Sequence, residues 1–209
     1  MYPVTTRTTP HRLAERVGYD RAVAHAILDE AYVCHLGFTA PDGPRVIPTL
    51  FARDGDTLYV HGSTGSGPLL ALRQGGPVCV TVTLLDGLVL ARSQFHHSAN
   101  YRSVVAYGTA TVVRDEADRR RAMDALVDKV VTGRSAQTRP PTERELAQTA
   151  LLALPLREAS AKARTGGVID EEEDYALPYW AGVVPLRLAA GAPEPDTGVA
   201  GPPPPYLVA

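Results

Sequence analysis

A run of glycine and hydroxyl residues between a strand pattern and a helix pattern is the segment best suited to chemistry. Residues 61–67 read His-Gly-Ser-Thr-Gly-Ser-Gly and follow the extended run 56–60. Such a turn exposes backbone N–H groups, and the dipole of the helix that follows adds positive charge, so the turn suits a phosphate. An ordinary serine and glycine turn that caps a surface helix explains the residues equally well. No Gly-Lys-Ser/Thr follows and the glycine spacing is not the dinucleotide fingerprint, so neither nucleotide motif is present.

A second polar segment, residues 93–103 (Ser-Gln-Phe-His-His-Ser-Ala-Asn-Tyr-Arg-Ser), lies between two apolar strand patterns. Polar groups between buried strands need hydrogen-bond partners, and a bound ligand would supply them. A plain polar loop is the alternative. His96 and His97 give only a weak metal pattern, because adjacent strand residues face opposite sides and no carboxylate or cysteine cluster completes a ligand set. We predict no metal site.

The chain lacks the side-chain machinery of a hydrolase. It has no Gly-x-Ser-x-Gly elbow, and neither Cys34 nor Cys79 has an evident activating neighbour. The strand patterns also lack paired carboxylates for acid–base work. A cofactor that carries its own reactivity would leave the protein only to hold and tune it.

Composition describes an ordinary globular protein. The 209 residues are 44% hydrophobic and 21% charged, with a formal net charge of −2, which gives no electrostatic reason to expect nucleic acid or an anionic membrane as a partner. The polar N-terminal residues resemble neither a signal peptide nor a membrane anchor. Two cysteines in apolar runs predict reduced, buried thiols in a cytoplasmic protein.

The periodicity of the chain predicts many short strands and few helices. We expect residues 1–19 to form a flexible arm, 20–188 one domain, and the Pro/Gly/Ala-rich residues 189–209 a disordered or extended tail. Strands are predicted at 32–39, 45–52, 57–61, 78–85, 88–93, 103–113, 150–156 and 182–188, and helices at 21–31, 69–73, 115–131 and 145–150. The absence of a regular strand–helix alternation indicates an antiparallel barrel or sandwich with peripheral helices.

Five segments together carry a resemblance to a known family. The sequence resembles the pyridoxamine 5′-phosphate oxidase-like superfamily of FMN-binding split barrels, in particular its flavin-nucleotide-binding and nitroimidazole-resistance-type branch. The resemblance implies a mainly β fold, an antiparallel Greek-key split barrel with peripheral helices. The segments are 45–50, 59–66, 78–92, 100–104 with Gly108, and 158–164.

The resemblance also implies a homodimer with FMN at the subunit interface. Pro48 and Thr49 would lie along the flavin ring, and the turn from His61 to Ser66 would hold the phosphate. The cofactor-binding residues implied are Arg45, Pro48, Thr49, His61, Gly62, Ser63, Thr64, Ser66, Arg102 and Ser103.

One departure from the family pattern affects the phosphate. Relatives commonly carry an arginine, or Arg-Lys, after the serine that matches Ser66, whereas this chain has Gly67 and Pro68. Losing a charge-assisted contact costs about 1.5–3 kcal/mol. Either Arg45, Arg73 or Arg102 compensates, or FMN binds weakly, or the pocket holds another group such as haem or a deazaflavin.

The resemblance favours an FMN-dependent oxidoreductase that transfers hydride or electrons to a small organic substrate. His96, Tyr101 and Trp180 are candidates to line the substrate side, although Trp180 fits a core or dimer-interface anchor better. No nucleic acid or membrane partner is expected. The alternatives are a non-catalytic flavin-binding sensor or carrier, and a haem-binding split-barrel enzyme.

Overall fold

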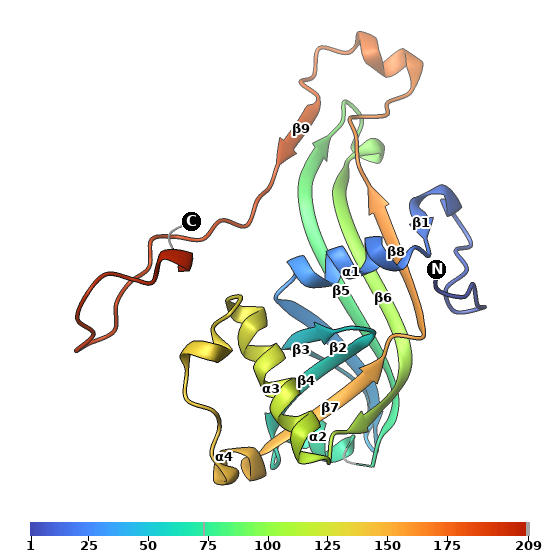
Figure 1. The fold of residues 1–209 in the computed structure, drawn as a ribbon. Helices are drawn as coiled ribbons and strands as arrows, with labels where there is room; N and C mark the ends of the chain where they lie inside the picture. Colours follow the sequence, from blue (N-terminus) through green and yellow to red (C-terminus); the bar gives the residue numbers. More distant parts are fainter. Residues whose placement is uncertain (73, 208–209) are drawn as a thin grey trace.

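A closed ring of antiparallel strands forms the centre of the molecule (Figure 1). The computed structural model describes residues 1–72 and 74–207. In that part of the chain six strands follow one another around the ring in the order β6-β7-β4-β3-β2-β5, and β5 pairs with β6 to close it. Their bounds are β2 (Val33–Ala40), β3 (Gly43–Asp54), β4 (Thr57–Ser63), β5 (Gly76–Leu90), β6 (Ser98–Val112) and β7 (Thr149–Pro155). The prediction of an antiparallel split barrel with peripheral helices is confirmed.

Three shorter strands extend the ring at its two longest members. β8 (Glu158–Arg164) pairs with β6 and carries β1 (Val17–Gly18) on its other edge, while β9 (Gly182–Pro185) pairs with β5. No strand is predicted at β8 from periodicity, although residues 158–164 are one of the segments that carry the family resemblance.

Local capping signals fix where the helices begin. Asp20 accepts a hydrogen bond from the Val23 N–H at 3.1 Å, and Thr142 and Glu145 form the predicted capping box. The helices are α1 (Arg21–Glu30), α2 (Gly67–Ala71), α3 (Glu116–Val130) and α4 (Glu143–Gln148), with 3₁₀ turns η1 (Ala14–Arg16), η2 (Gln94–His96), η3 (Ser135–Gln137), η4 (Glu172–Ala176) and η5 (Pro205–Leu207).

The strand β5 is continuous, which corrects the prediction of two strands separated by a turn at Asp86-Gly87. The pairing of β5 with β6 shifts by one residue between Leu85 and Gly87, so this segment forms a bulge instead of a turn. Arg102 on β6 binds the Asp86 carboxylate and holds it against the neighbouring strand. As a result, the β5–β6 hairpin runs past the ring.

We call this extension the arm. It consists of residues 85–101 at the far end of the hairpin, the segment 165–181, and β9, and it forms the upper part of the molecule in Figure 1.

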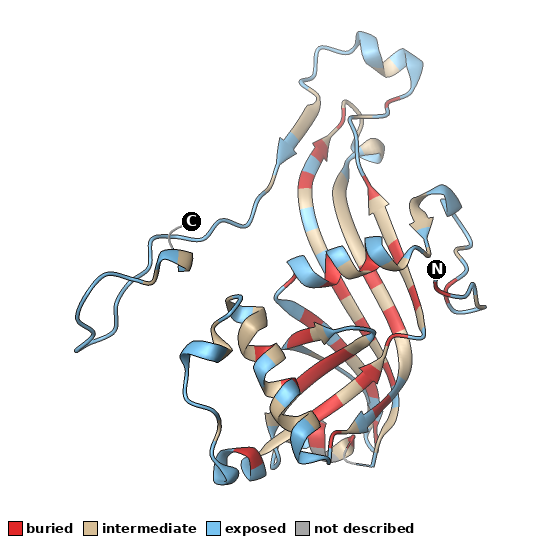
Figure 2. Cartoon of the chain, viewed as in Figure 1, coloured by how far each residue is buried: buried red, intermediate tan, exposed pale blue. Residues whose placement is uncertain are grey.

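Buried residues concentrate inside the ring, whereas the C-terminal tail is almost wholly exposed (Figure 2). Phe51, Leu36 and Val82 are among the fully buried side chains of the main core. A second cluster, which includes Ala122 and Leu126 of α3, packs against the outer side of β3 and β4. The tail contacts the body through Tyr206, whose hydroxyl donates to Gln137 at 2.7 Å. In the described part of the chain, every helix is too short or too polar to cross a membrane.

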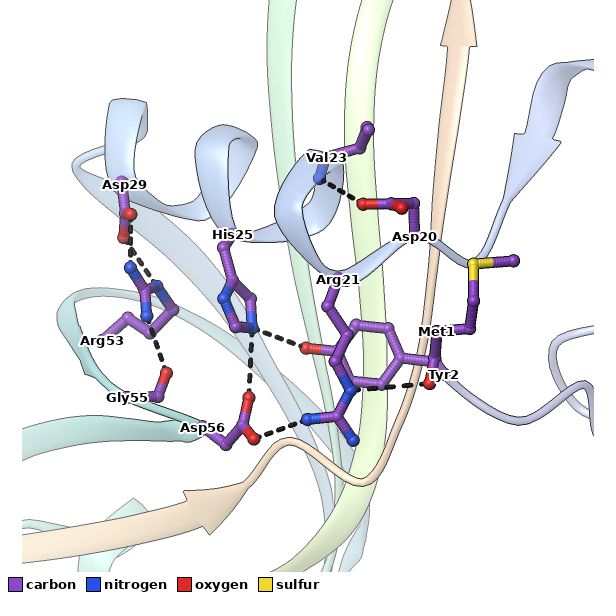
Figure 3. A network of polar contacts seen from close by, with 10 residues as sticks. All are labelled: Met1, Tyr2, Asp20, Arg21, Val23, His25, Asp29, Arg53, Gly55 and Asp56. Carbon is purple, nitrogen blue, oxygen red and sulfur yellow. Dashed lines mark hydrogen bonds and ion pairs between the residues drawn. The ribbon is translucent and has the colours of Figure 1, made fainter.

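In this structure the N-terminal residues pack on the barrel, whereas the sequence predicts a flexible N-terminal segment at residues 1–19. Tyr2 is 3% exposed, and its hydroxyl lies 2.9 Å from His25 Nε2 (Figure 3). His25 also faces Asp56, which binds Arg21. These partners are contributed by α1 and the β3–β4 turn, so no pattern within the first nineteen residues indicates them.

Candidate functional site

The glycine-rich turn follows β4 and begins α2, as predicted, but its amides are largely occupied. Thr64 N–H donates to the Gln148 carbonyl at 3.0 Å, and Ser66 N–H donates to the Ser63 carbonyl at 2.9 Å. Gly65 N–H donates to Ser63 Oγ at 3.2 Å. In this structure these three amides bind the protein itself, so an anion at this turn would need side chains as well, and the turn as the phosphate site stays a prediction.

Arg45 supplies the positive charge beside the turn. Its Nη1 lies 3.8 Å from the position that a Cβ at Gly67 would occupy. Arg45 belongs to β3 and pairs with Asp42, with 2.5 Å between Nη2 and Oδ2. The guanidinium thus lies close to where a side chain at position 67 would begin, the position at which the family resemblance predicts an arginine. Arg73, another candidate for this role, falls outside the described residues.

Arg102 is committed to two carboxylates elsewhere in the fold. Its guanidinium binds Asp86 at 2.7 and 2.9 Å and Glu30 at 2.5 and 2.8 Å. These hydrogen bonds, Glu30 first and then Asp86, raise the pKa of Arg102 and lower the pKa of each carboxyl group. Since its charge is already offset, Arg102 is a poor phosphate ligand. The neighbouring Ser103 hydroxyl donates to the Lys162 carbonyl at 3.2 Å.

His61 carries an unsatisfied atom next to the turn. Among the described residues, its Nδ1 is one of three buried side-chain nitrogen or oxygen atoms without a hydrogen-bond partner. Burial lowers the pKa of His61, so the ring is neutral at pH 7. A Cβ at the neighbouring Gly62 would lie 2.5 Å from Leu69 Cδ1, so a larger residue there would have to displace the end of that leucine side chain. An orphaned buried atom of this kind indicates a missing partner.

The outer surface of β2 and β3 is apolar and exposed. Val46 is 66% exposed, and the cross-strand neighbours Val33 and Leu50 are 44% and 43% exposed. Pro48 lies opposite His35 in the same row, and Thr49 is the next residue along β3. An exposed apolar sheet face of this kind suits a flat ligand or a second protein chain.

A cavity of about 930 Å³ opens beside the turn, within the range of pockets that hold cofactors. Thr64 and Leu69 form one part of its wall, and the remaining lining residues include Gln74, Arg114, Glu116, Arg119 and Glu143.

The substrate-side candidates lie at the other end of the molecule. His96 is the last residue of η2, between β5 and β6, and pairs with Glu171, with 3.2 Å between Nε2 and Oε1. Trp180 is 67% exposed, so in this chain it is not a core residue. The strand β5 has 15 residues, so its first and last residues are about 46 Å apart along the strand. Within one chain, His96 and Trp180 are therefore far from the turn. Tyr101 lies opposite Leu85 at the base of the arm.

Sequence reasoning missed a buried ion pair in the arm. Asp170, whose side chain is fully buried, binds the backbone N–H of Arg92 at 3.2 Å and the Arg92 guanidinium at 3.0 Å. Arg92 Nε and Ser93 Oγ are the other two buried atoms without a partner in the described chain. Asp170 directly precedes the acidic run 171–174, and no local signal in the sequence distinguishes it from those residues.

Comparison with known proteins places the chain in a family. The sequence profile described as pyridoxamine 5′-phosphate oxidase matches residues 20–163. The chain belongs to the pyridoxamine 5′-phosphate oxidase-like split-barrel family. The flavocytochrome Anf3 from Azotobacter vinelandii is 39% identical, with a TM-score of 0.90 over 98% of this chain and 96% of that chain. The FAD and haem binding protein from Mycobacterium smegmatis is 41% identical, with a TM-score of 0.87 over 92% of this chain and 96% of that chain.

A more distant member of the split-barrel group shares the fold. A Bacteroides thetaiotaomicron protein assigned to 5-nitroimidazole antibiotic resistance is 23% identical, with a TM-score of 0.59 over 70% of this chain and 85% of that chain. Comparison with curated protein sequences found no match. The predicted family is confirmed, whereas the individual cofactor-binding and substrate-side residues stay predictions.

Proposed function

We propose that this split-barrel protein binds a flavin and a haem and transfers electrons between them. Two structures about 40% identical to it over at least 92% of its length are a flavocytochrome and an FAD and haem binding protein. That observation carries the proposal. It favours the flavin- and haem-binding alternatives from the sequence over an oxidoreductase that uses FMN alone.

The turn end of the barrel fits a flavin nucleotide. Arg45 would offset the phosphate charge, with the hydroxyls of Ser63, Thr64 and Ser66 as additional donors. The unpaired Nδ1 of His61 offers a further contact. We infer that the flavin ring lies along the exposed face of β3 at Pro48 and Thr49. We leave Arg102 and Ser103 out of this proposed set, because their side chains bind other parts of the chain.

We infer that the flavin is FAD. Both relatives with about 40% identity are haem proteins that carry a flavin, and one is named as an FAD binder. The 930 Å³ cavity adjoins the turn at Thr64 and has room for the AMP half of FAD. Binding of FMN alone would leave this cavity without a role.

The protein would act as a homodimer. The apolar face formed by Val33, Val46 and Leu50 is exposed in the single chain, and a second copy would cover it. The distance along β5 supports the same conclusion, because the arm of one chain does not reach its own turn. A flavin exchanges electrons singly or in pairs and a haem singly, so the two would connect a two-electron donor to a one-electron acceptor.

Absorption spectroscopy of the purified full-length protein, reconstituted with FAD, FMN and hemin in separate samples and with FAD and hemin together, tests the proposal. We expect a flavin spectrum with FAD, a Soret band with hemin, and a shift of the Soret band when the flavin is reduced. Mass spectrometry of the released cofactor distinguishes FAD from FMN, and light scattering gives the oligomeric state. Retention of neither cofactor would refute the proposal.

A second function, reduction of a small organic substrate by the flavin, is favoured by the exposed Trp180 and the half-buried His96 in the arm. Rapid reoxidation of the reduced protein by nitroaromatics or quinones would support it. Reoxidation only through the haem would exclude it.

A further inference from the structure

We propose that His97, at the tip of the arm, is the axial ligand of the haem iron. This inference rests on the proposed function, since it presumes that a haem binds. It assigns the ligand to one residue of an adjacent histidine pair, and three observations support that choice.

The first observation is the tautomer of His97. Its Nδ1 lies 2.9 Å from the Ser93 carbonyl oxygen. A carbonyl oxygen only accepts hydrogen bonds, so Nδ1 must carry the proton and the lone pair of the neutral ring is on Nε2. Histidine ligands of metals commonly donate their second ring N–H to a backbone carbonyl, which fixes the ring and increases its basicity. His97 has this arrangement and is exposed, so its Nε2 is available.

The second observation is the support beneath that carbonyl. The fully buried carboxylate of Asp170 binds the backbone N–H and the guanidinium of Arg92, the residue before Ser93. The backbone that orients His97 is therefore tied to the segment on the opposite side of the arm. Arg92 Nε and Ser93 Oγ are buried there without partners. The propionate carboxylates of a haem are suitable acceptors for both atoms.

The third observation is an exposed apolar face next to His97. Leu88 and Val184 are cross-strand neighbours, 41% and 40% exposed. The Trp180 ring lies over Gly182, within 2.9 Å of where a Cβ would be, and Gly182 pairs with Leu90. Because alternate residues share a face, Trp180 covers the same side of the sheet as Leu88 and Val184. Ser98 pairs with Val89, so continuing the register places His97 opposite Leu90 on that side.

The other histidines fit the role less well. His96 is adjacent, but its Nε2 is already engaged by Glu171. The unpaired atom of His61 is Nδ1, on a half-buried ring beside the flavin turn. His35 is exposed on β2, in the face that a second copy would cover.

Hemin titration of the full-length protein, followed by the Soret band, tests the assignment. We expect His97→Gly to bind hemin at least about tenfold more weakly than wild type, and added imidazole to restore the wild-type spectrum by replacing the side chain. His97→Gln retains a polar side chain at the site and should show the same loss. The matched control is His96→Gly, which should bind hemin as wild type does. Circular dichroism confirms that each variant is folded.

The outcomes separate this inference from the proposed function. If wild type binds hemin and His97→Gly binds it equally well with the same spectrum, the assignment is wrong while the flavocytochrome proposal stands. Loss of the Soret band in His61→Gly alone would move the ligand to the turn. If wild type itself gives no Soret band, the haem part of the proposed function fails and this inference fails with it.

Discussion

Among the described residues, buried side-chain atoms without a hydrogen-bond partner occur at two places, the turn end of the barrel and the arm, and their surroundings differ. The turn end contains the unpaired Nδ1 of His61, and the arm contains the unpaired Arg92 Nε and Ser93 Oγ. At the turn end most of these contacts are short in sequence, such as Gly65 to Ser63 and Leu69 to Ser66, and Thr64 to Gln148 is the long-range exception. In the arm, Arg92 reaches Asp170 across 78 residues. The two proposed ligand sites therefore differ in origin, because one is built mostly from local contacts and the other is assembled by the fold.

The variant Arg45→Ser should give the largest effect, confined to the turn end. Loss of a charge-assisted phosphate contact costs about 1.5–3 kcal/mol, or roughly ten- to a hundredfold in flavin affinity. Fluorescence titration with FAD measures it. Arg102→Gln is the control, because Arg102 binds Glu30 and Asp86 instead, so it should keep wild-type flavin affinity. Equal losses in the two variants would contradict the placement of the phosphate.

The variant Asp170→Asn should weaken hemin binding and leave flavin binding unchanged, the opposite of the result expected for Arg45→Ser. Removing the charge weakens the link to the backbone of Arg92, which precedes the carbonyl that orients His97. Hemin affinity should fall about tenfold, as it does when outer partners of a metal ligand are removed, while flavin affinity stays at the wild-type level. Asp196→Asn, in the exposed tail, is a matched control that should affect neither cofactor. A flavin defect in Asp170→Asn would show that the two ends are not independent.

The variant Ser66→Ala should have a smaller effect, again at the turn end. It removes one neutral hydroxyl donor worth about 1 kcal/mol, which is about fivefold in flavin affinity. The midpoint of urea unfolding should stay close to that of wild type. Full FAD occupancy in both Ser66→Ala and a variant with a bulky residue at Ser63 would place the phosphate elsewhere.

The smallest predicted effect is a dependence of stability on pH that originates at His61. Burial lowers the pKa of His61 in the folded protein below its ordinary value of 6.5. As the pH falls below 6.5, the unfolded chain gains a proton before the folded one does, so the free energy of unfolding decreases until the folded pKa is passed. Urea unfolding at pH 7.5 and 5.5 should show a smaller decrease for His61→Gln than for wild type. An unchanged decrease would mean that His61 is solvated in the folded state.

The predictable parts of the fold are those with local causes. Asp20 caps α1, and Thr142 with Glu145 caps α4. In each case the two partners are three positions apart, so the sequence shows the pattern directly. The continuity of β5 was not predictable, because Asp86-Gly87 is a typical turn pair and its partner Arg102 lies sixteen residues away. The packing of the N-terminus was not predictable for the same reason, because Tyr2 contacts His25 of α1, which lies 23 residues away in the sequence.

The candidate site follows the same division. The sequence predicts a role for the turn and for Arg45, and the structure brings the two together, although the amides of the turn bind the protein itself. Asp170 was missed because its partner Arg92 is remote in the chain. The sequence gives no reason to choose between His96 and His97 as a ligand, because it does not show which ring nitrogen is engaged, whereas the contacts with Glu171 and with the Ser93 carbonyl do.

The closeness of Arg45 and Gly67 has an evolutionary consequence. An arginine introduced at position 67 would place its Cβ 3.8 Å from the Arg45 guanidinium, and two like charges so close together would repel each other. We therefore expect a basic residue at one of the two positions to disfavour a basic residue at the other. In an alignment of split-barrel sequences, a basic residue at position 45 should accompany a small residue at position 67, and the reverse, so that the pair covaries even though the two residues are twenty-two positions apart.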